Sequence, residues 1–313
     1  MVRQPIRIGA RGSKLSVVQA EFVRAAIARA FGVDNAAVVI KITTSGDRIQ
    51  DRTLAEIGGK GLFTLEIEEA LLAGRIDCAV HSLKDMPVDN PTGLAIAAVP
   101  EREDPRDAFV SLGFESLAAL PPGAKLGTAS LRRQAQALRA RPDLTIVALR
   151  GNVDTRLAKL ERGEADAIIL AAAGLNRLGL SQHVRAYIDP EASPPAPGQG
   201  ALAIQTREQD CAAAWLADLR HWPTLLAVTA ERGALAALDG SCRTAVGAYA
   251  RMVGDNLVLD VEALSPDGRQ CFSANGAIRL PREDQGGARA AEFGLRLGGD
   301  VKIQAGDALT AGV

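Results

Sequence analysis

In two stretches of the chain, short apolar runs alternate with helical patterns in the same order. This repeat limits the possible folds more than any other feature. In the first stretch, residues 6–10, 38–44 and 78–83 read as strands, and residues 13–31 and 62–73 as helices. Strands that alternate with helices predict a mostly parallel sheet with helices on its faces. The chain is therefore expected to begin with an α/β lobe.

The second stretch follows the same pattern. Strand-like runs lie at 124–129, 145–150 and 167–171, and helical patterns at 130–140 and 152–163 separate them. Both stretches also contain the order strand, glycine, turn, serine, helix. This order occurs in RIGARGSKLS (7–16) and in KLGTASLRRQ (125–134). We therefore expect two related lobes, with Ser13 as the N-cap of the first helix.

Two segments, one before and one after the second stretch, have the composition of hinges. Residues 101–107 are rich in charge, and residues 193–200 are rich in proline and glycine. The run 201–206 then reads as a strand that returns to the first lobe. Ligands of two-lobed α/β proteins bind at the carboxyl ends of the strands, between the lobes.

A third region follows the second hinge. A helix is expected at 225–238, and three strands are expected at 245–252, 256–265 and 270–279. The turns between these strands contain Gly-Asp-Asn and Pro-Asp-Gly, which favour hairpins. The fold class is therefore α/β, with a small C-terminal α+β domain that has an antiparallel sheet. The expected domains are 1–100 with 201–219, 101–200, and 220–313.

The composition excludes several classes of protein. The net charge of −1 argues against general binding of nucleic acid. No apolar run is long enough for a membrane span, and the N-terminal segment lacks the apolar core of a secretory signal, so we expect a cytoplasmic protein. The cysteines and histidines are scattered, which gives a metal site no support. These residues are Cys78, Cys211, Cys242, Cys271, His81, His183 and His221.

The arginines are concentrated where helices are expected to begin. Arg132 and Arg133 follow Thr128 and Ser130, and further arginines follow the next strands. A helix start combined with a guanidinium group fits a carboxylate or a phosphate. The set comprises Arg11, Arg132, Arg133, Arg150, Arg156 and Arg177. It predicts a ligand with many negative groups. The alternative for Arg132 and Arg133 is a capped helix with solvent-facing arginines. The alternative for Arg150 and Arg156 is an internal salt bridge to Asp154 or Asp166.

Three further positions are candidates for chemistry. Lys84 and Asp85 follow the strand at 78–83, so Asp85 could act as an acid, a base or a counter-ion, or the pair could be a solvated turn. Cys242 lies in a loop of small residues, where it could carry a covalent group or be inert. Lys60 lies in the glycine-rich segment 57–63, which reads equally as a lid or as a passive loop.

The motifs that hold these residues resemble those of the porphobilinogen deaminase, or hydroxymethylbilane synthase, family. The resemblance spans nearly the whole chain. It rests, in order, on RGSKLS, TTSGD, GGKGLF, HSLKDMP, EREDPRDAF, GTASLRRQ, LRGNVDTRL, GLNRLGL, PAPGQGAL and GSC. It implies a transferase (EC 2.5.1.61) of tetrapyrrole and haem biosynthesis that condenses four porphobilinogen molecules and then releases hydroxymethylbilane by hydrolysis. It also implies two lobes like those of periplasmic binding proteins.

The resemblance also implies roles for individual residues. Cys242 would hold a dipyrromethane cofactor through a thioether, and Asp85 would be the central catalytic residue with Lys84 beside it. The remaining cofactor-binding positions would be Ser82, Lys84, Asp85, Thr128, Ser130, Arg132, Arg133, Arg150 and Gly151. The substrate-binding positions would be Arg11, Ser13, Lys60, Arg150, Arg156 and Arg177. The expected partner is porphobilinogen alone, bound by a monomer, without nucleic acid, membrane or metal.

Some residues depart from common family patterns, and two other functions compete. Gly12, Glu56 and Ala129 differ from residues frequent in the family, and Ala129 removes one hydroxyl from the expected anion cradle. One alternative is a two-lobed binding module for a small anionic metabolite. The other is a thiol enzyme that uses Cys242 as nucleophile, although no histidine lies in an evident partner motif.

Overall fold

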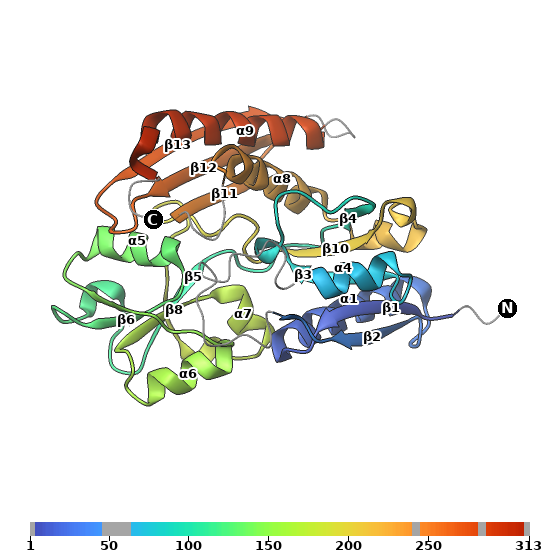
Figure 1. The fold of residues 1–313 in the computed structure, drawn as a ribbon, viewed down its shortest axis with the longest axis horizontal. Helices are drawn as coiled ribbons and strands as arrows, with labels where there is room; N and C mark the ends of the chain where they lie inside the picture. The colour runs from blue at the N-terminus through green and yellow to red at the C-terminus, as the bar shows by residue number, and fades with distance from the viewer. Residues whose placement is uncertain (1–3, 46–63, 240–244, 281–285, 310–313) are drawn as a thin grey trace. The chain divides into compact units, whose positions relative to one another are not determined.

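The computed structural model describes residues 4–45, 64–239, 245–280 and 286–309 (Figure 1). The chain divides into two compact units. The first comprises Met1–Glu103 and Gly200–Leu225, and the second comprises Asp104–Gln199 and Leu226–Val313. Two of the three crossings between the units fall within the expected hinges, 101–107 and 193–200, and the third lies within the helix Trp222–Ala237. The finer division into three domains stays a prediction.

The first unit contains a five-stranded sheet in the order β2-β1-β3-β10-β4. The strands are β1 (Ile6–Arg11), β2 (Ala37–Ile42), β3 (Cys78–Ser82), β4 (Leu94–Ala98) and β10 (Leu202–Arg207). The strands β2, β1 and β3 pair in parallel, whereas β10 runs antiparallel to both of its neighbours. The sheet is therefore mixed. The returning strand is confirmed, and β4 was not predicted.

Helix α1 (Lys14–Phe31) begins and ends where local chemistry directs it. The Ser16 backbone N–H donates to Ser13 Oγ at 3.3 Å, which confirms the predicted N-cap, and Gly32 ends the helix at φ 64°. The helix buries Val23 and Ile27 in the apolar core of the sheet. The other helical segments of this unit are α4 (Leu65–Leu72), η1 (Leu83–Asp85), η4 (Glu208–Asp210) and η5 (Ala214–Leu219).

The second unit contains another five-stranded sheet, in the order β7-β6-β8-β5-β9. Its strands are β5 (Asp107–Ser111), β6 (Lys125–Gly127), β7 (Thr145–Val147), β8 (Ala167–Ala171) and β9 (Val184–Tyr187). Again three strands pair in parallel, and β5 runs against its neighbours. The helical segments are α5 (Leu131–Ala140), α6 (Val153–Glu161), α7 (Ala172–Arg177), η2 (Leu117–Ala119) and η3 (Ser181–His183). The sequence analysis missed β5 and β9.

The rest of the second unit is a three-stranded antiparallel sheet with helices, as expected. Its elements are α8 (Trp222–Ala237), β11 (Ala245–Val253), β12 (Asn256–Leu264), β13 (Cys271–Arg279), α9 (Gly286–Ala305) and η6 (Gly306–Leu309). Figure 1 shows α9, which was not predicted, lying along this sheet. Gly294 of α9 contacts the backbone of Ala230 in α8, so the two helices approach closely. None of the described helices is long and apolar enough to span a membrane.

Candidate functional site

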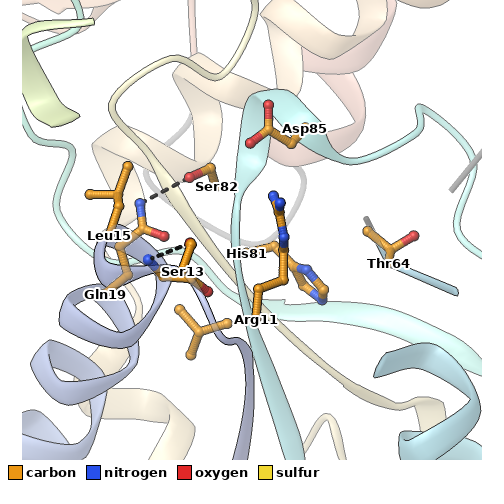
Figure 2. A pocket seen from close by; sticks show the side chains of 10 residues that line it. Arg11, Ser13, Leu15, Gln19, Thr64, His81, Ser82 and Asp85 are labelled. Carbon is orange, nitrogen blue, oxygen red and sulfur yellow. Dashed lines mark hydrogen bonds between the residues drawn. The ribbon is translucent and has the colours of Figure 1, made fainter. Parts of the chain in front are cut away.

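A small pocket of about 70 Å³ lies in the first unit, where β1 and β3 end. Arg11 at the end of β1 and Ser82 at the end of β3 both line it, and Asp85 follows in η1. Figure 2 shows the Arg11 side chain extending toward Asp85. The described residues that line the pocket are Arg11, Ser13, Leu15, Ser16, Gln19, Thr64, Val80, His81, Ser82 and Asp85. An acid and a cation predicted from separate motifs thus share one pocket.

The turn after β3 is what exposes Asp85. The buried Leu83 donates its backbone N–H to the Ala201 carbonyl at 3.0 Å, and Met86 N–H donates to the Leu83 carbonyl at 3.1 Å. These bonds and the burial of Leu83 anchor the turn, and Lys84 and Asp85 remain exposed. The structure therefore makes both side chains accessible.

Behind the pocket, a buried polar chain links three elements. His81 Nε2 of β3 lies 3.2 Å from Gln205 Oε1 of β10, and Gln205 Nε2 donates to Glu68 Oε1 of α4 at 3.4 Å. Burial lowers the pKa of His81 to about 4. The nearby Arg11 charge also lowers it, and the Gln205 bond opposes both effects. His81 is therefore neutral at physiological pH.

In the second unit, three parallel strands end at one edge of the sheet and lead into helices. The strand β6 leads to α5, β7 to α6 and β8 to α7. At the first of these junctions, Thr128 Oγ1 accepts from Ser130 N–H at 3.1 Å, and Ser130 Oγ caps α5 by accepting from Arg133 N–H at 3.4 Å. The predicted hydroxyl pair thus shapes the start of the helix that carries Arg132 and Arg133.

Arg132 and Arg133 do not face solvent; they are buried with Asp107. These three residues are each at most 6% exposed. Asp107 Oδ2 accepts from Arg132 Nη1 at 2.8 Å, and Oδ1 accepts from Arg133 Nη2 at 2.7 Å. Burial alone would raise the pKa of the Asp107 carboxyl, but the two guanidinium groups hold it well below its usual range. Two guanidinium groups thus share the Asp107 carboxylate.

Gln199 connects this cluster to the first hinge. Its side chain is fully buried, and Nε2 donates to Asp107 Oδ1 at 2.9 Å and to the Pro105 carbonyl at 2.8 Å. Its Oε1 accepts from Arg133 Nη2 at 3.3 Å. The sequence analysis missed Asp107 and Gln199 as site residues, although both lie in motifs that it quoted. Both residues contact the arginines only in the folded chain, where β5 and the second hinge lie next to each other.

The junction of β7 and α6 holds the next predicted residues. Gly151 has φ 116°, and a Cβ there would crowd the Thr155 side chain at 2.7 Å, so glycine is required. Arg156 Nε donates to the Gly151 carbonyl at 2.8 Å, and Lys159 Nζ donates to the Arg150 carbonyl at 3.2 Å. Arg150, Arg156 and Arg177 are all half-buried. The structure thus places Arg150, Gly151 and Arg156 at this junction, whereas Arg177 lies at the far end of α7.

The remaining candidates are structural or fall outside the described residues. Lys60, Glu56 and Cys242 lie outside the described residues. Cys78 is buried in the core of the first sheet, which raises the pKa of its thiol, and Cys211 packs against that core. Cys271 packs at the edge of a small apolar cluster in the second unit. Within the described residues, no group of histidines, cysteines and carboxylates could hold a metal ion.

Comparisons with known proteins agree with the motifs. Residues 6–214 match the family model described as "Porphobilinogen deaminase, dipyromethane cofactor binding domain", and residues 225–301 match "Porphobilinogen deaminase, C-terminal domain". The porphobilinogen deaminase of Caulobacter vibrioides (strain NA1000 / CB15N) is 64% identical, with 99% of each chain covered. That of Ralstonia nicotianae is 52% identical, with 91% of this chain and 86% of the relative covered.

Among solved structures, the similarities are weaker. The methionine binding protein MetQ matches with a TM-score of 0.45 and 16% identity, over 69% of this chain and 88% of that one. A periplasmic substrate-binding protein from Coxiella burnetii matches with a TM-score of 0.44 and 16% identity, over 72% of this chain and 96% of that one. The description of two mixed lobes therefore rests on the sheets themselves.

Proposed function

Because the chain belongs to the porphobilinogen deaminase family, we propose that its motif residues have the roles that the family pattern predicts. The activity is that of hydroxymethylbilane synthase, EC 2.5.1.61. Four porphobilinogen molecules are joined head to tail with loss of ammonia, and water then releases the linear tetrapyrrole. The observation that carries the assignment of roles is the gathering of these residues at the carboxyl edges of the two sheets.

The arginine cluster of the second unit fits a group that carries carboxylates. Arg132 Nη1 donates to Asp107, Gln136 and the Pro194 carbonyl. The buried Nε–H of Arg132 has no acceptor among the described residues. A buried donor without a partner is costly, so a ligand carboxylate there would be stabilising. The dipyrromethane has two carboxylates on each ring. Arg132, Arg133 and Arg150 would bind them, with Thr128 and Ser130 beside them.

The thioether to Cys242 is proposed from the sequence and from the element that follows it. Cys242 precedes Ala245, the first residue of β11, by three positions. Ala245 packs in one buried cluster with Ala135 of the helix that carries Arg132 and Arg133. This arrangement supports attachment of the cofactor beside those arginines. When bound, the dipyrromethane supplies the pyrrole carbon to which the first substrate unit is joined.

Asp85 is proposed to stabilise the positive charge that develops on the substrate as ammonia leaves. Its carboxylate lines the pocket with Arg11, which would hold a substrate carboxylate together with Ser13. The exposed Lys84 would add a further cation. In this arrangement the cations orient the substrate by its carboxylates, and the acid acts at its nitrogen atoms.

The mass of the intact purified protein tests the attachment. We expect the wild type to exceed its sequence mass by one dipyrromethane, and Cys242→Ser to lose both this excess and the activity. Cys271→Ser is the matched control from the same unit, and it should retain the excess mass. A folded, active wild type with no added mass would contradict the proposal.

We further propose that the chain is a cytoplasmic monomer with domains 1–100 plus 201–219, 101–200, and 220–313. The small substrate supports this proposal, because no partner subunit is needed to bind it. The first and last domains each contain a sheet of their own, as does the middle one. Light scattering that gave twice the chain mass, or proteolysis that spared both hinges, would contradict it.

A further inference from the structure

The chain His81–Gln205–Glu68 has a defined direction of hydrogen bonding. The three residues are 6%, 0% and 6% exposed, so they are largely shielded from solvent. Gln205 Nε2 donates to Glu68 Oε1, so the Gln205 oxygen, which can only accept, faces His81 Nε2. The hydrogen of the neutral imidazole therefore lies on Nε2.

The direction of the hydrogen bonds determines whether His81 Nδ1 is a donor or an acceptor. With the hydrogen on Nε2, the Nδ1 atom is unprotonated and can only accept. His81 lines the same pocket as Arg11, Ser82 and Asp85, and the Arg11 charge is close enough to lower its pKa (Figure 2). The pocket lining thus includes an imidazole whose Nδ1 makes no hydrogen bond within the described residues, close to a cation and an acid.

Porphobilinogen has groups of both kinds. Its two carboxylates match the cations, while its pyrrole N–H and its ammonium group can only donate. We propose that His81 Nδ1 accepts a hydrogen bond from one of these N–H groups, and that Gln205 and Glu68 hold the ring in the tautomer that makes this possible. The inference rests on the function proposed above and adds a substrate-binding residue to it.

Two amide variants separate this role from a structural one. His81→Asn places an amide near the position of Nδ1, whereas His81→Gln places one near the position of Nε2. We expect His81→Asn to stay within about threefold of the wild-type kcat/KM and His81→Gln to lose about tenfold, as for one hydrogen bond. The reverse order, or equal losses, would overturn the proposal.

Side-chain NMR tests the tautomer in the intact holoenzyme, whatever the variants do to folding. The chain has three histidines, so ¹⁵N-histidine labelling gives a simple spectrum. We expect a neutral imidazole with hydrogen on Nε2 for His81 at pH 7, and a second tautomer in Glu68→Gln but not in the exposed control Glu69→Gln. Hydrogen on Nδ1 in the wild type would overturn the proposal. Product formation and cofactor mass in the wild type test the proposed function separately.

Discussion

The two five-stranded sheets share one topology but hold different chemistry. In both, three parallel strands at one side of the sheet are followed by a reversed strand and an edge strand, in the orders β2-β1-β3-β10-β4 and β7-β6-β8-β5-β9. The first sheet ends in a small pocket with an exposed acid, Asp85. The second ends in arginines, two of which are buried against Asp107. The same strand order therefore supports an exposed acid in one lobe and buried cations in the other.

The equivalent acids of the two lobes make the comparison sharper. Asp77 precedes β3 and accepts from Arg7 N–H at 2.8 Å, and Asp166 precedes β8 and accepts from Lys125 N–H at 2.7 Å. These paired positions confirm the repeat seen in the sequence. Because they hold strand ends and lie outside the pocket, they are structural counterparts, whereas Asp85 and Asp107 are not equivalent.

The largest expected effect is the loss of turnover in Asp85→Asn. Removing the charge from an exposed side chain should leave folding and cofactor content unchanged and lower kcat by about 10²–10⁴-fold. Quenched assays of product formation, normalised to cofactor mass, would measure it. Asp89→Asn, an exposed neighbour, is the control. Turnover close to that of the wild type would refute a catalytic role for Asp85.

The next largest effect is expected from Asp107→Asn, in the other lobe. It leaves two buried guanidinium groups without their carboxylate, which should cost about 3–5 kcal/mol in urea unfolding. The exposed pair of Asp143 and Arg141 in the same lobe is the control, and Asp143→Asn should change stability little. Equal effects of the two substitutions would show that burial does not set the strength of the Asp107 cluster.

The same cluster predicts a pH dependence. Arg132 and Arg133 lower the pKa of Asp107 in the folded state. The contribution of Asp107 to the free energy of unfolding is therefore complete above the pKa of an unfolded aspartate, about 3.9. It declines as the pH falls below that value. The difference in the free energy of unfolding between the wild type and Asp107→Asn should accordingly shrink as the pH is lowered through this range. A difference that stayed constant would contradict the assignment.

The sequence predicted the elements that repeat and missed those that depend on distant contacts. The parallel strands of both sheets and α1 carry local apolar patterns and caps, as at Ser13, so they were found. The strand β5 was missed because it begins at the charged residue Asp107. The burial of this carboxylate depends on its hydrogen bonds with Arg132 and Arg133. Helix α9 was missed because its glycines lower helix propensity. Contact with α8 explains Gly294 and Gly298, whereas a Cβ on Gly299 would meet open space.

The site was predictable to a similar degree. Motif residues such as Asp85 and Arg132 follow strand ends and could be placed at a sheet edge from the sequence. The burial of Arg132 could not be foreseen, because its partners Asp107 and Pro194 are far away in the chain. For the same reason, no local pattern reveals that Gln205 fixes the hydrogen of His81.

Glycines at matching places in β1 and β6 give a smaller effect. A Cβ on Gly127 would meet the buried side chains of Leu149 and Ile168, whereas one on Gly9 would meet chiefly the end of Ile76. Gly127→Ala should therefore cost about 1–3 kcal/mol, and Gly9→Ala less, because a single terminal methyl can shift. Urea unfolding of both variants measures the difference. A larger cost at Gly9 would show that the first lobe is the more tightly packed.

The smallest effect should separate the paired acids Asp77 and Asp166. Asparagine at either position can still accept from the backbone N–H that holds the strand end. Asp77→Asn also loses the charge that pairs with Arg7, whose Nη2 lies 2.7 Å from Asp77 Oδ1. That pair is partly exposed, so the expected cost is at most about 1 kcal/mol and should shrink at high salt. Asp166→Asn should cost less and show no such salt dependence. Equal, salt-independent costs would mean that the Arg7 pair adds nothing to a backbone bond that both lobes share.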